Sequence, residues 1–242
     1  MEKILFRKRI IKAGIIWSVI NVIDIIACYS NLLEMFEKGM IDKIAFNETI
    51  VTGDFHSILQ YGVVYMFAFL IGVGYILGNE RVEKIVRYEQ RKKFYLERVK
   101  KVCIVVLLFS FIHEITSIIF ILIYGDYSLL IRHNWVEGIV CQIIVSFMYY
   151  LITFFVLTII CAKWKKSTGI IYTVIIMAVQ YYVSTKFLPF IYMPVKDVGI
   201  LAEICSGTCS YMQGTIILMR LMLVTVILGN MCLKMKDRED VL

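Results

Sequence analysis

The chain has 242 residues, of which 60% are hydrophobic and only 19% are charged, and its mean hydropathy is +0.79. Soluble domains contain roughly 45–50% apolar and about 25% charged residues, so this composition excludes a secreted globular enzyme, a nucleic-acid-binding domain and a disordered chain. Several uncharged stretches reach the length of about 18 residues or more that crosses a bilayer core. We therefore expect an all-α polytopic membrane protein, in which the net charge of +7 sets orientation.

Six membrane-spanning helices are predicted from the distribution of apolar residues. No loop is long enough for a separate folded domain, and no internal repeat or low-complexity linker is visible, so residues 1–242 are expected to form one membrane domain. The predicted spans are, in chain order, 13–33, 58–78, 102–124, 139–162, 168–185 and 214–233.

The N-terminal segment 1–12 mixes apolar and basic residues, as in an interfacial helix that lies along the inner leaflet. An ordinary basic anchor for the first span is the alternative. The first apolar run covers 21 residues and is interrupted by Asp24, whereas the apolar core of a signal peptide is shorter and uncharged. We therefore expect this segment to be retained as a membrane helix.

Charged residues within the predicted spans are costly, so each calls for a partner or a function. Asp24 shares a helix face with Asn21 in span one, and His113 and Glu114 lie near the middle of span three. Arg220 lies in span six. In a structural role, a carboxylate pairs with Arg220 or hydrogen-bonds to another helix. In a functional role, Asp24 and Glu114 line a polar path that contacts a cationic substrate, and His113 relays protons.

The segment 79–101 is the largest charged feature, with nine basic and four acidic residues and no Pro or Gly. Its aliphatic residues recur at helical spacing, which predicts an amphipathic helix. A basic helix of this kind can bind anionic lipid headgroups. The interspersed Glu, Tyr and aliphatic residues favour a further role, docking to a cytoplasmic partner.

Basic residues are distributed unevenly among the loops. The N-terminus, the segment 79–101, the link 163–166 and the C-terminus together hold 20 of the 26 Lys and Arg residues, and the alternate loops hold five. Because basic loops remain on the cytoplasmic side, both termini are predicted to be cytoplasmic.

The predicted outer loop 186–213 is too apolar for a free loop. It favours short re-entrant helices, and the alternative is an extension of span five past a proline kink. Within it, Cys205 and Cys209 are close enough in sequence to form a disulfide if they lie outside the cytoplasm, or they remain two thiols. No His is near them and no second Cys pair follows, so no metal site is predicted.

Catalytic motifs are absent from the sequence: no nucleophile has a neighbouring base, and no G-x-x-x-x-G-K-[ST] loop for a nucleotide is present. We therefore expect no catalytic residue and no cofactor in this chain.

The basic N-terminus, the charged segment between spans two and three, and the apolar loop between spans five and six together resemble the permease subunits of ABC-2-type exporters. Residues 80–98 look like the coupling helix of that family. The resemblance implies an ABC ATPase as a separate cytoplasmic subunit that binds ATP and Mg²⁺, and a second permease copy or a sister permease. The residues that would contact the ATPase are Glu80, Glu83, Arg87, Tyr88, Arg91 and Phe94.

The compact size is similar to that of permeases with which bacteria export bacteriocins or lantibiotics, or gain immunity to them. This resemblance implies a bacterial plasma membrane protein and an amphipathic peptide or lipid-like substrate. Two other functions remain open from the residues alone. One is a proton-coupled secondary transporter that uses Asp24 and Glu114, and the other is a membrane scaffold or sensor that transports nothing.

Overall fold

The computed structural model describes residues 2–77, 91–126, 128, 131, 134–188 and 190–238 of the chain. Within these residues all regular structure is helical. The elements are α1 (Glu2–Glu37), α2 (Lys43–Thr52), η1 (Asp54–His56), η2 (Gln60–Tyr65), α3 (Met66–Leu77), α5 (Arg91–Tyr124), α7 (Trp135–Cys161), α8 (Lys166–Tyr182), η3 (Val183–Phe187), η4 (Pro194–Gly199), α9 (Ile200–Cys205) and α10 (Tyr211–Arg238).

Six helical segments in the described part of the chain are long and apolar enough to cross a membrane. Each overlaps one predicted span, so the prediction of an all-α polytopic membrane protein with six spans is confirmed. The segments are Ile4–Glu37, Gln60–Leu77, Lys93–Tyr124, Trp135–Cys161, Lys166–Phe187 and Met212–Met235.

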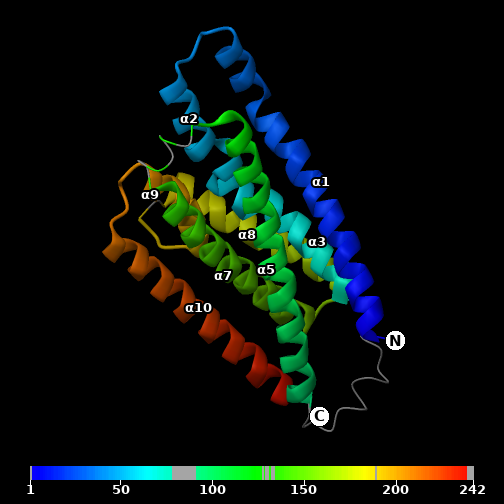
Figure 1. Cartoon of the computed structure of the whole chain (residues 1–242). Helices are drawn as coiled ribbons and strands as arrows, with labels where there is room; N and C mark the ends of the chain where they lie inside the picture. Colours follow the sequence, from blue (N-terminus) through cyan, green and yellow to red (C-terminus); the bar gives the residue numbers. More distant parts are fainter. Residues whose placement is uncertain are drawn as a thin grey trace.

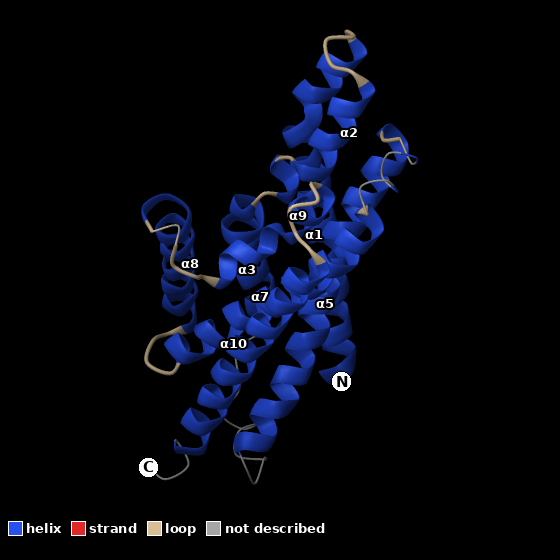
Figure 2. Cartoon of the chain, turned by 90° about the vertical axis from the view of Figure 1, so that its left-hand side faces the viewer, coloured by secondary structure: helices blue, strands red, loops and turns tan. Residues whose placement is uncertain are grey.

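The two ends of the helix bundle carry different parts of the chain. Figure 1 shows the N-terminus, the C-terminus and the beginning of α5 at one end, and α2 and α9 at the opposite end. The view turned by 90° gives the same arrangement, with α2 far from both termini (Figure 2). Both termini therefore lie at one end of the bundle, as an even number of spans requires.

The first helix differs from the prediction of a separate interfacial helix at residues 1–12. α1 runs without a break from Glu2 to Glu37, a length of 36 residues or about 54 Å. No proline interrupts this stretch, so the backbone hydrogen bonds continue from the basic residues into the span. The basic N-terminal segment is thus continuous with span one, as in the alternative of a basic anchor for that span.

The end of α1 is fixed by Gly39, whose φ of +68° suits a residue without a Cβ. The Gly39 amide donates to the Phe36 carbonyl at 3.0 Å, and the Met40 amide donates to the Met35 carbonyl at 2.9 Å. These two bonds satisfy carbonyls that the helix end would otherwise leave unpaired. The chain then turns back, and Asp42 caps α2 by accepting from the Ala45 amide at 2.7 Å.

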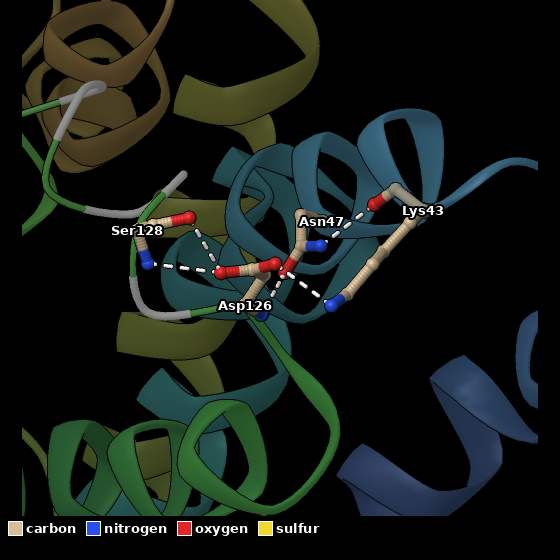
Figure 3. A network of polar contacts seen from close by, with 4 residues as sticks. All are labelled: Lys43, Asn47, Asp126 and Ser128. Carbon is tan, nitrogen blue, oxygen red and sulfur yellow. Dashed lines mark hydrogen bonds and ion pairs between the residues drawn. The ribbon is translucent and has the colours of Figure 1, made fainter.

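A polar network joins α2 to the residues that follow α5 (Figure 3). Lys43 lies 2.7 Å from a carboxylate oxygen of Asp126, and the Asn47 side-chain oxygen accepts from the Asp126 amide at 2.7 Å. The amide and hydroxyl of Ser128 both donate to Asp126, at 3.0 and 2.7 Å. These hydrogen bonds from Lys43 and Ser128 lower the pKa of Asp126, which stays ionised and holds the two segments together.

The helix α5 begins before the predicted third span. The apolar segment starts at Lys93, whereas the sequence predicted a start at residue 102. The described part of the predicted coupling helix, residues 91–98, forms the first turns of α5 and continues directly into the membrane segment. Residues 80–90 of the predicted coupling helix lie outside the described residues.

The apolar loop 186–213 folds back onto the bundle as the short helices η4 and α9, while span five ends at Phe187. Gln142 of α7 holds both short helices: its amide nitrogen donates to the Val198 carbonyl at 2.7 Å, and its oxygen accepts from the Leu201 amide at 3.2 Å. Val195 and Val198 are fully buried. The expectation of short helices in this loop therefore agrees with the structure.

Helices α1 and α3 approach most closely where Trp17 lies over Gly72. A Cβ built on Gly72 would lie 2.1 Å from Cζ2 of Trp17, so only glycine fits beneath the indole ring. The indole N–H donates to the Ala68 carbonyl at 3.3 Å, and the ring packs edge-on against Phe109 of α5 with centroids 4.7 Å apart. One side chain thus connects three spans.

Candidate functional site

Polar side chains from α1, η1, η2 and α5 meet in the interior of the bundle. We refer to them as the buried polar cluster, and most are almost completely shielded from solvent. The members are Asn21, Asp24, His56, Gln60, Tyr61, Tyr65, His113, Glu114 and Ser117.

The carboxylate of Glu114 lies at the centre of the cluster and is 0% exposed. One oxygen, Oε1, accepts a short hydrogen bond from the Tyr61 hydroxyl. The other oxygen, Oε2, has no hydrogen-bond partner among the described residues. The Tyr61 oxygen also lies 3.5 Å from Nδ1 of His56, so Tyr61 stands between the carboxylate and a second histidine.

The tautomer of His113 follows from its neighbour Asn21 on α1. The Asn21 amide nitrogen donates to the Trp17 carbonyl at 2.8 Å, so the Asn21 oxygen faces Nδ1 of His113 at 2.7 Å. Because an amide oxygen only accepts, Nδ1 carries the proton and Nε2 carries a lone pair. Nε2 of His113 is buried, with no hydrogen-bond partner in the described part of the chain.

The second acidic residue, Asp24, lies beside this centre and is partly buried. Its carboxylate accepts from the Gln60 amide at 3.1 and 3.3 Å and from the Tyr65 hydroxyl through a short bond. Asp24 and Glu114 therefore each accept from a tyrosine of η2. A shared polar region was one of the two alternatives from the sequence, and the structure has Asp24 of α1 and Glu114 of α5 bound to tyrosines four residues apart on η2.

Histidine 56 is a member of the cluster that sequence reasoning missed. It lies in η1, just before span two, in a stretch without clear periodicity, and only the fold brings it to Ser117 of α5 at 2.7 Å. The side chain is 2% exposed, and burial lowers the pKa of His56 to about 3. His56 is therefore neutral at physiological pH and offers a lone pair on one ring nitrogen.

Aromatic rings enclose His113 on several sides. The Phe55 ring stacks on the imidazole with centroids 4.3 Å apart and an interplanar angle of 8°. The rings of Tyr61 and Tyr65 approach it edge-on at 4.5 and 4.4 Å. This shell shields the imidazole from solvent, and electrostatic interactions are stronger in such low-dielectric surroundings.

A π-helical turn supplies the two tyrosines. In η2 the backbone departs from the regular α-helical pattern, and two tyrosines of α7 donate to its carbonyls: Tyr149 to that of Gly62 at 3.1 Å and Tyr150 to that of Tyr61 at 3.3 Å. Turns of this kind are frequent at functional sites. Helix α7 thus holds the turn that positions the donors to Asp24 and Glu114.

The cluster holds two carboxylates, those of Asp24 and Glu114. No Lys or Arg among the described residues lies within ion-pairing distance of Asp24 or Glu114. Each buried polar atom without a partner costs about 1–3 kcal/mol, and the cost rises for a charge. Nε2 of His113 and Oε2 of Glu114 are two such atoms in one enclosed space, so the arrangement is suited to binding a proton or a cation.

Arg220, in predicted span six, pairs with a carboxylate outside this cluster. Its guanidinium forms a bidentate pair with Asp197 of η4, in which Nε lies 3.1 Å from Oδ2 and the second bond is short. The Tyr192 hydroxyl also donates to Asp197 at 2.8 Å, and the guanidinium lies 4.2 Å from the Tyr192 ring centroid. The sequence did not indicate Asp197 because the loop had no defined position relative to α10.

The residues predicted to contact an ATPase lie at the beginning of α5 and before it. Glu80, Glu83, Arg87 and Tyr88 lie outside the described residues. Arg91 is the first residue of α5, and Phe94 is half-buried in its first turn.

Cys205 and Cys209 are both thiols in the structure, which is the second of the two alternatives that the sequence left open. Cys205 ends α9 and points toward α7, where a Cβ on Gly138 would lie 3.5 Å from its sulfur. Cys209 follows the turn at Gly207 and donates to the Ser210 carbonyl at 3.5 Å. The two sulfurs are therefore held by different elements.

The two thiols are expected to react at different rates with a maleimide. Burial raises the pKa of Cys205 to about 12, so almost no thiolate is present at pH 7.5, whereas Cys209 is more exposed. In single-cysteine variants we expect Cys209 to label at least about tenfold faster than Cys205. Equal rates, or labelling that requires prior reduction, would contradict this arrangement.

Comparison with known proteins gave no match: no family model, no curated protein and no solved structure is significantly similar to this chain.

Proposed function

We propose that the chain is the membrane-spanning subunit of an ATP-driven exporter of the ABC-2 type in a bacterial plasma membrane. ATP hydrolysis takes place on a separate cytoplasmic subunit, which docks on the charged segment 79–101. The proposed substrate is an amphipathic peptide or a lipid-like molecule, as in bacteriocin or lantibiotic export or immunity. The resemblance of residues 80–98 to a coupling helix supports this proposal.

The observation that carries the proposal is the continuity of α5. This helix joins the charged segment directly to the buried polar cluster, since Arg91 begins it and His113 and Glu114 lie on it. From Arg91 to Glu114 the helix rises about 35 Å. A helix without a break transmits a displacement along its axis, so movement at the docking segment would shift both cluster residues against α1 and η2.

A second permease copy or a sister permease completes the proposed pathway. Helices α1, α8 and α10 present many exposed apolar side chains, among them Ile23 on α1 and Met219 on α10. Such faces contact lipid or another permease helix. In the proposed exporter, part of this surface is the interface with the second permease.

The docking segment is tested by charge reversal. The double variant Arg87→Glu/Arg91→Glu is expected to lose at least about 90% of the ATPase that copurifies with the tagged wild-type chain, because like charges across an interface repel. Lys163→Glu/Lys165→Glu is the matched control, since it changes two charges in another loop on the same predicted side. The measurement is the amount of copurified nucleotide-binding subunit, determined by quantitative mass spectrometry from detergent extracts.

Equal loss in both double variants would mean that general surface charge, and not this segment, recruits the ATPase. Retention of the ATPase in Arg87→Glu/Arg91→Glu would refute the docking role of the segment.

Proton-coupled secondary transport is the second candidate, favoured by the buried chain of His56, Tyr61 and Glu114. The two functions differ in their energy source. Transport by a secondary transporter would continue in vesicles without ATP and stop when a protonophore abolishes the proton gradient. The proposed exporter would show the opposite dependence.

A further inference from the structure

We propose that His56, His113 and Glu114 form a binding site for one divalent first-row transition-metal ion, with Zn²⁺ as the best chemical fit. This inference is independent of the proposed function, because it rests on the cluster alone. It also reverses the expectation from the sequence, which predicted no metal site.

The geometry brings three ligand atoms together. One ring nitrogen of His56, one of His113 and a carboxylate oxygen of Glu114 all lie within 4.8 Å of one another, and all three residues are buried. Zinc bonds to nitrogen and oxygen at about 2.0–2.1 Å, which places its ligand atoms about 3.3 Å apart in a tetrahedron. Side-chain rotations that move the ligand atoms by about 1 Å would therefore close the site around an ion.

The donor atoms are available for coordination. Nε2 of His113 carries a lone pair because Nδ1 donates to Asn21, and it has no partner among the described residues. Oε2 of Glu114 is likewise without a partner in that part of the chain, while Oε1 is held by Tyr61. Two nitrogens and one carboxylate oxygen are a common zinc ligand set that leaves a fourth position for water.

Both histidines have the second partner that metal-binding histidines usually possess. His113 donates its Nδ1–H to Asn21 at 2.7 Å. Nε2 of His56 lies 2.7 Å from the Ser117 hydroxyl oxygen, and Nδ1 on the other side of the ring is directed at Tyr61. These contacts orient each ring and leave Nε2 of His113 and Nδ1 of His56 for the ion, with the Tyr61 hydroxyl shifting from Nδ1 when the ion binds.

Charge and solvation favour a cation in this place. A buried carboxylate such as that of Glu114, which has no Lys or Arg partner among the described residues, must be protonated or compensated by a bound cation. A proton on Oε2 of Glu114 could be shared with Nε2 of His113 in one hydrogen bond, but it would not engage His56. A divalent ion satisfies both atoms at once, and its preference for imidazole points to a transition metal rather than Mg²⁺ or Ca²⁺.

Metal binding would join two parts of the chain that are distant in sequence. His56 lies in η1 before span two, whereas His113 and Glu114 lie on α5. An ion shared by them would fix η1 to α5 near the position where α1 also contributes Asn21. Bound metal is therefore expected to raise the thermal stability of the protein.

The experiment uses the full-length chain in detergent with an affinity tag that contains no histidine. After chelator treatment and its removal, Zn²⁺ is titrated by calorimetry and the bound metal is counted by elemental analysis. We expect one Zn²⁺ per chain in the wild type. The single variants His56→Gln, His113→Gln and Glu114→Gln keep a polar side chain but are expected to weaken binding by about 100-fold or more.

The matched control is His133→Ala, which removes the third histidine of the chain and should retain wild-type affinity. A spectroscopic test with Co²⁺ is expected to show the visible bands of a four-coordinate nitrogen and oxygen site, lost in each of the three ligand variants. Size-exclusion chromatography of each variant checks that it remains folded. Absence of stoichiometric binding in the wild type, or unchanged affinity in the three variants, would overturn the proposal and leave a proton as the occupant.

Discussion

Replacing Arg220 with Met is expected to destabilise the protein by about 3 kcal/mol at pH 7.5, the lower end of the cost of breaking a buried ion pair. The variant leaves the Asp197 carboxylate, whose side chain is 1% exposed, without its bidentate partner, although Tyr192 still donates to it. The lower end of this cost applies because the pair is only partly buried: the Arg220 side chain is 38% exposed in the wild type. The measurement is the midpoint of unfolding in mixed detergent.

The same variant should depend on pH in a defined direction. Burial already raises the pKa of Asp197, while Arg220 acts against that rise, so removal of Arg220 raises the pKa further. A carboxyl group whose pKa is higher in the folded state than in the unfolded state stabilises the protein at low pH and loses this effect as pH rises through the folded pKa. Arg220→Met is therefore expected to recover stability as pH falls.

The control for this pH dependence is Asp197→Asn in the Arg220→Met background, which cannot ionise. Glu203 also has a pKa raised by burial and by Asp197, so the control separates its contribution from that of Asp197. A pH profile that is identical with Asp or Asn at position 197 would contradict this account of the pair.

Gly72→Ala is expected to destabilise the protein by about 3 kcal/mol, the upper end of the cost of overpacking a core. The new Cβ would lie 2.1 Å from Trp17 Cζ2 and 2.7 Å from Cε2. The ring cannot move aside easily, because Trp17 is 2% exposed and packs against Phe109. The helices α1 and α3 would have to separate to admit the methyl group.

Gly74→Ala is the matched control on the same helix. Its Cβ would lie 3.3 Å from the flexible end of Ile170, which can shift, and alanine gains about 0.5–1 kcal/mol over glycine within a helix. Its stability should therefore lie within about 1 kcal/mol of the wild type. Equal destabilisation by the two substitutions, measured by thermal unfolding in detergent, would show that Gly72 is not the contact that holds α1 against α3.

The sequence predicted those features that depend on local pattern. Long apolar runs with few charges locate the six spans, and the same pattern shows that Asn21, Asp24, His113 and Glu114 lie within two of them. The predicted spans were shorter than the helices where charged residues continue a helix past the apolar run. Helix α5 shows this, since its basic first turns extend the span without a break.

Features that depend on tertiary contacts could not be predicted. His56 belongs to a loop segment, and only the packing of η1 against α5 gives it a role in the cluster. The partner of Arg220 is Asp197, a residue of the loop 186–213 whose position follows from the burial of Val195 and Val198 against the bundle. Cys205 is directed at α7, whereas Cys209 donates to the Ser210 carbonyl. The short spacing of the two cysteines in the sequence does not reveal these separate contacts.

The most direct test of the proposed exporter is ATP hydrolysis by the complex that copurifies with this chain from its native membrane. The proposal predicts vanadate-sensitive hydrolysis in the wild-type preparation. It also predicts little hydrolysis in the Arg87→Glu/Arg91→Glu preparation, with wild-type hydrolysis in the Lys163→Glu/Lys165→Glu control. A folded chain that purifies without any ATP-hydrolysing subunit, or hydrolysis that is the same in all three preparations, would contradict the proposed function.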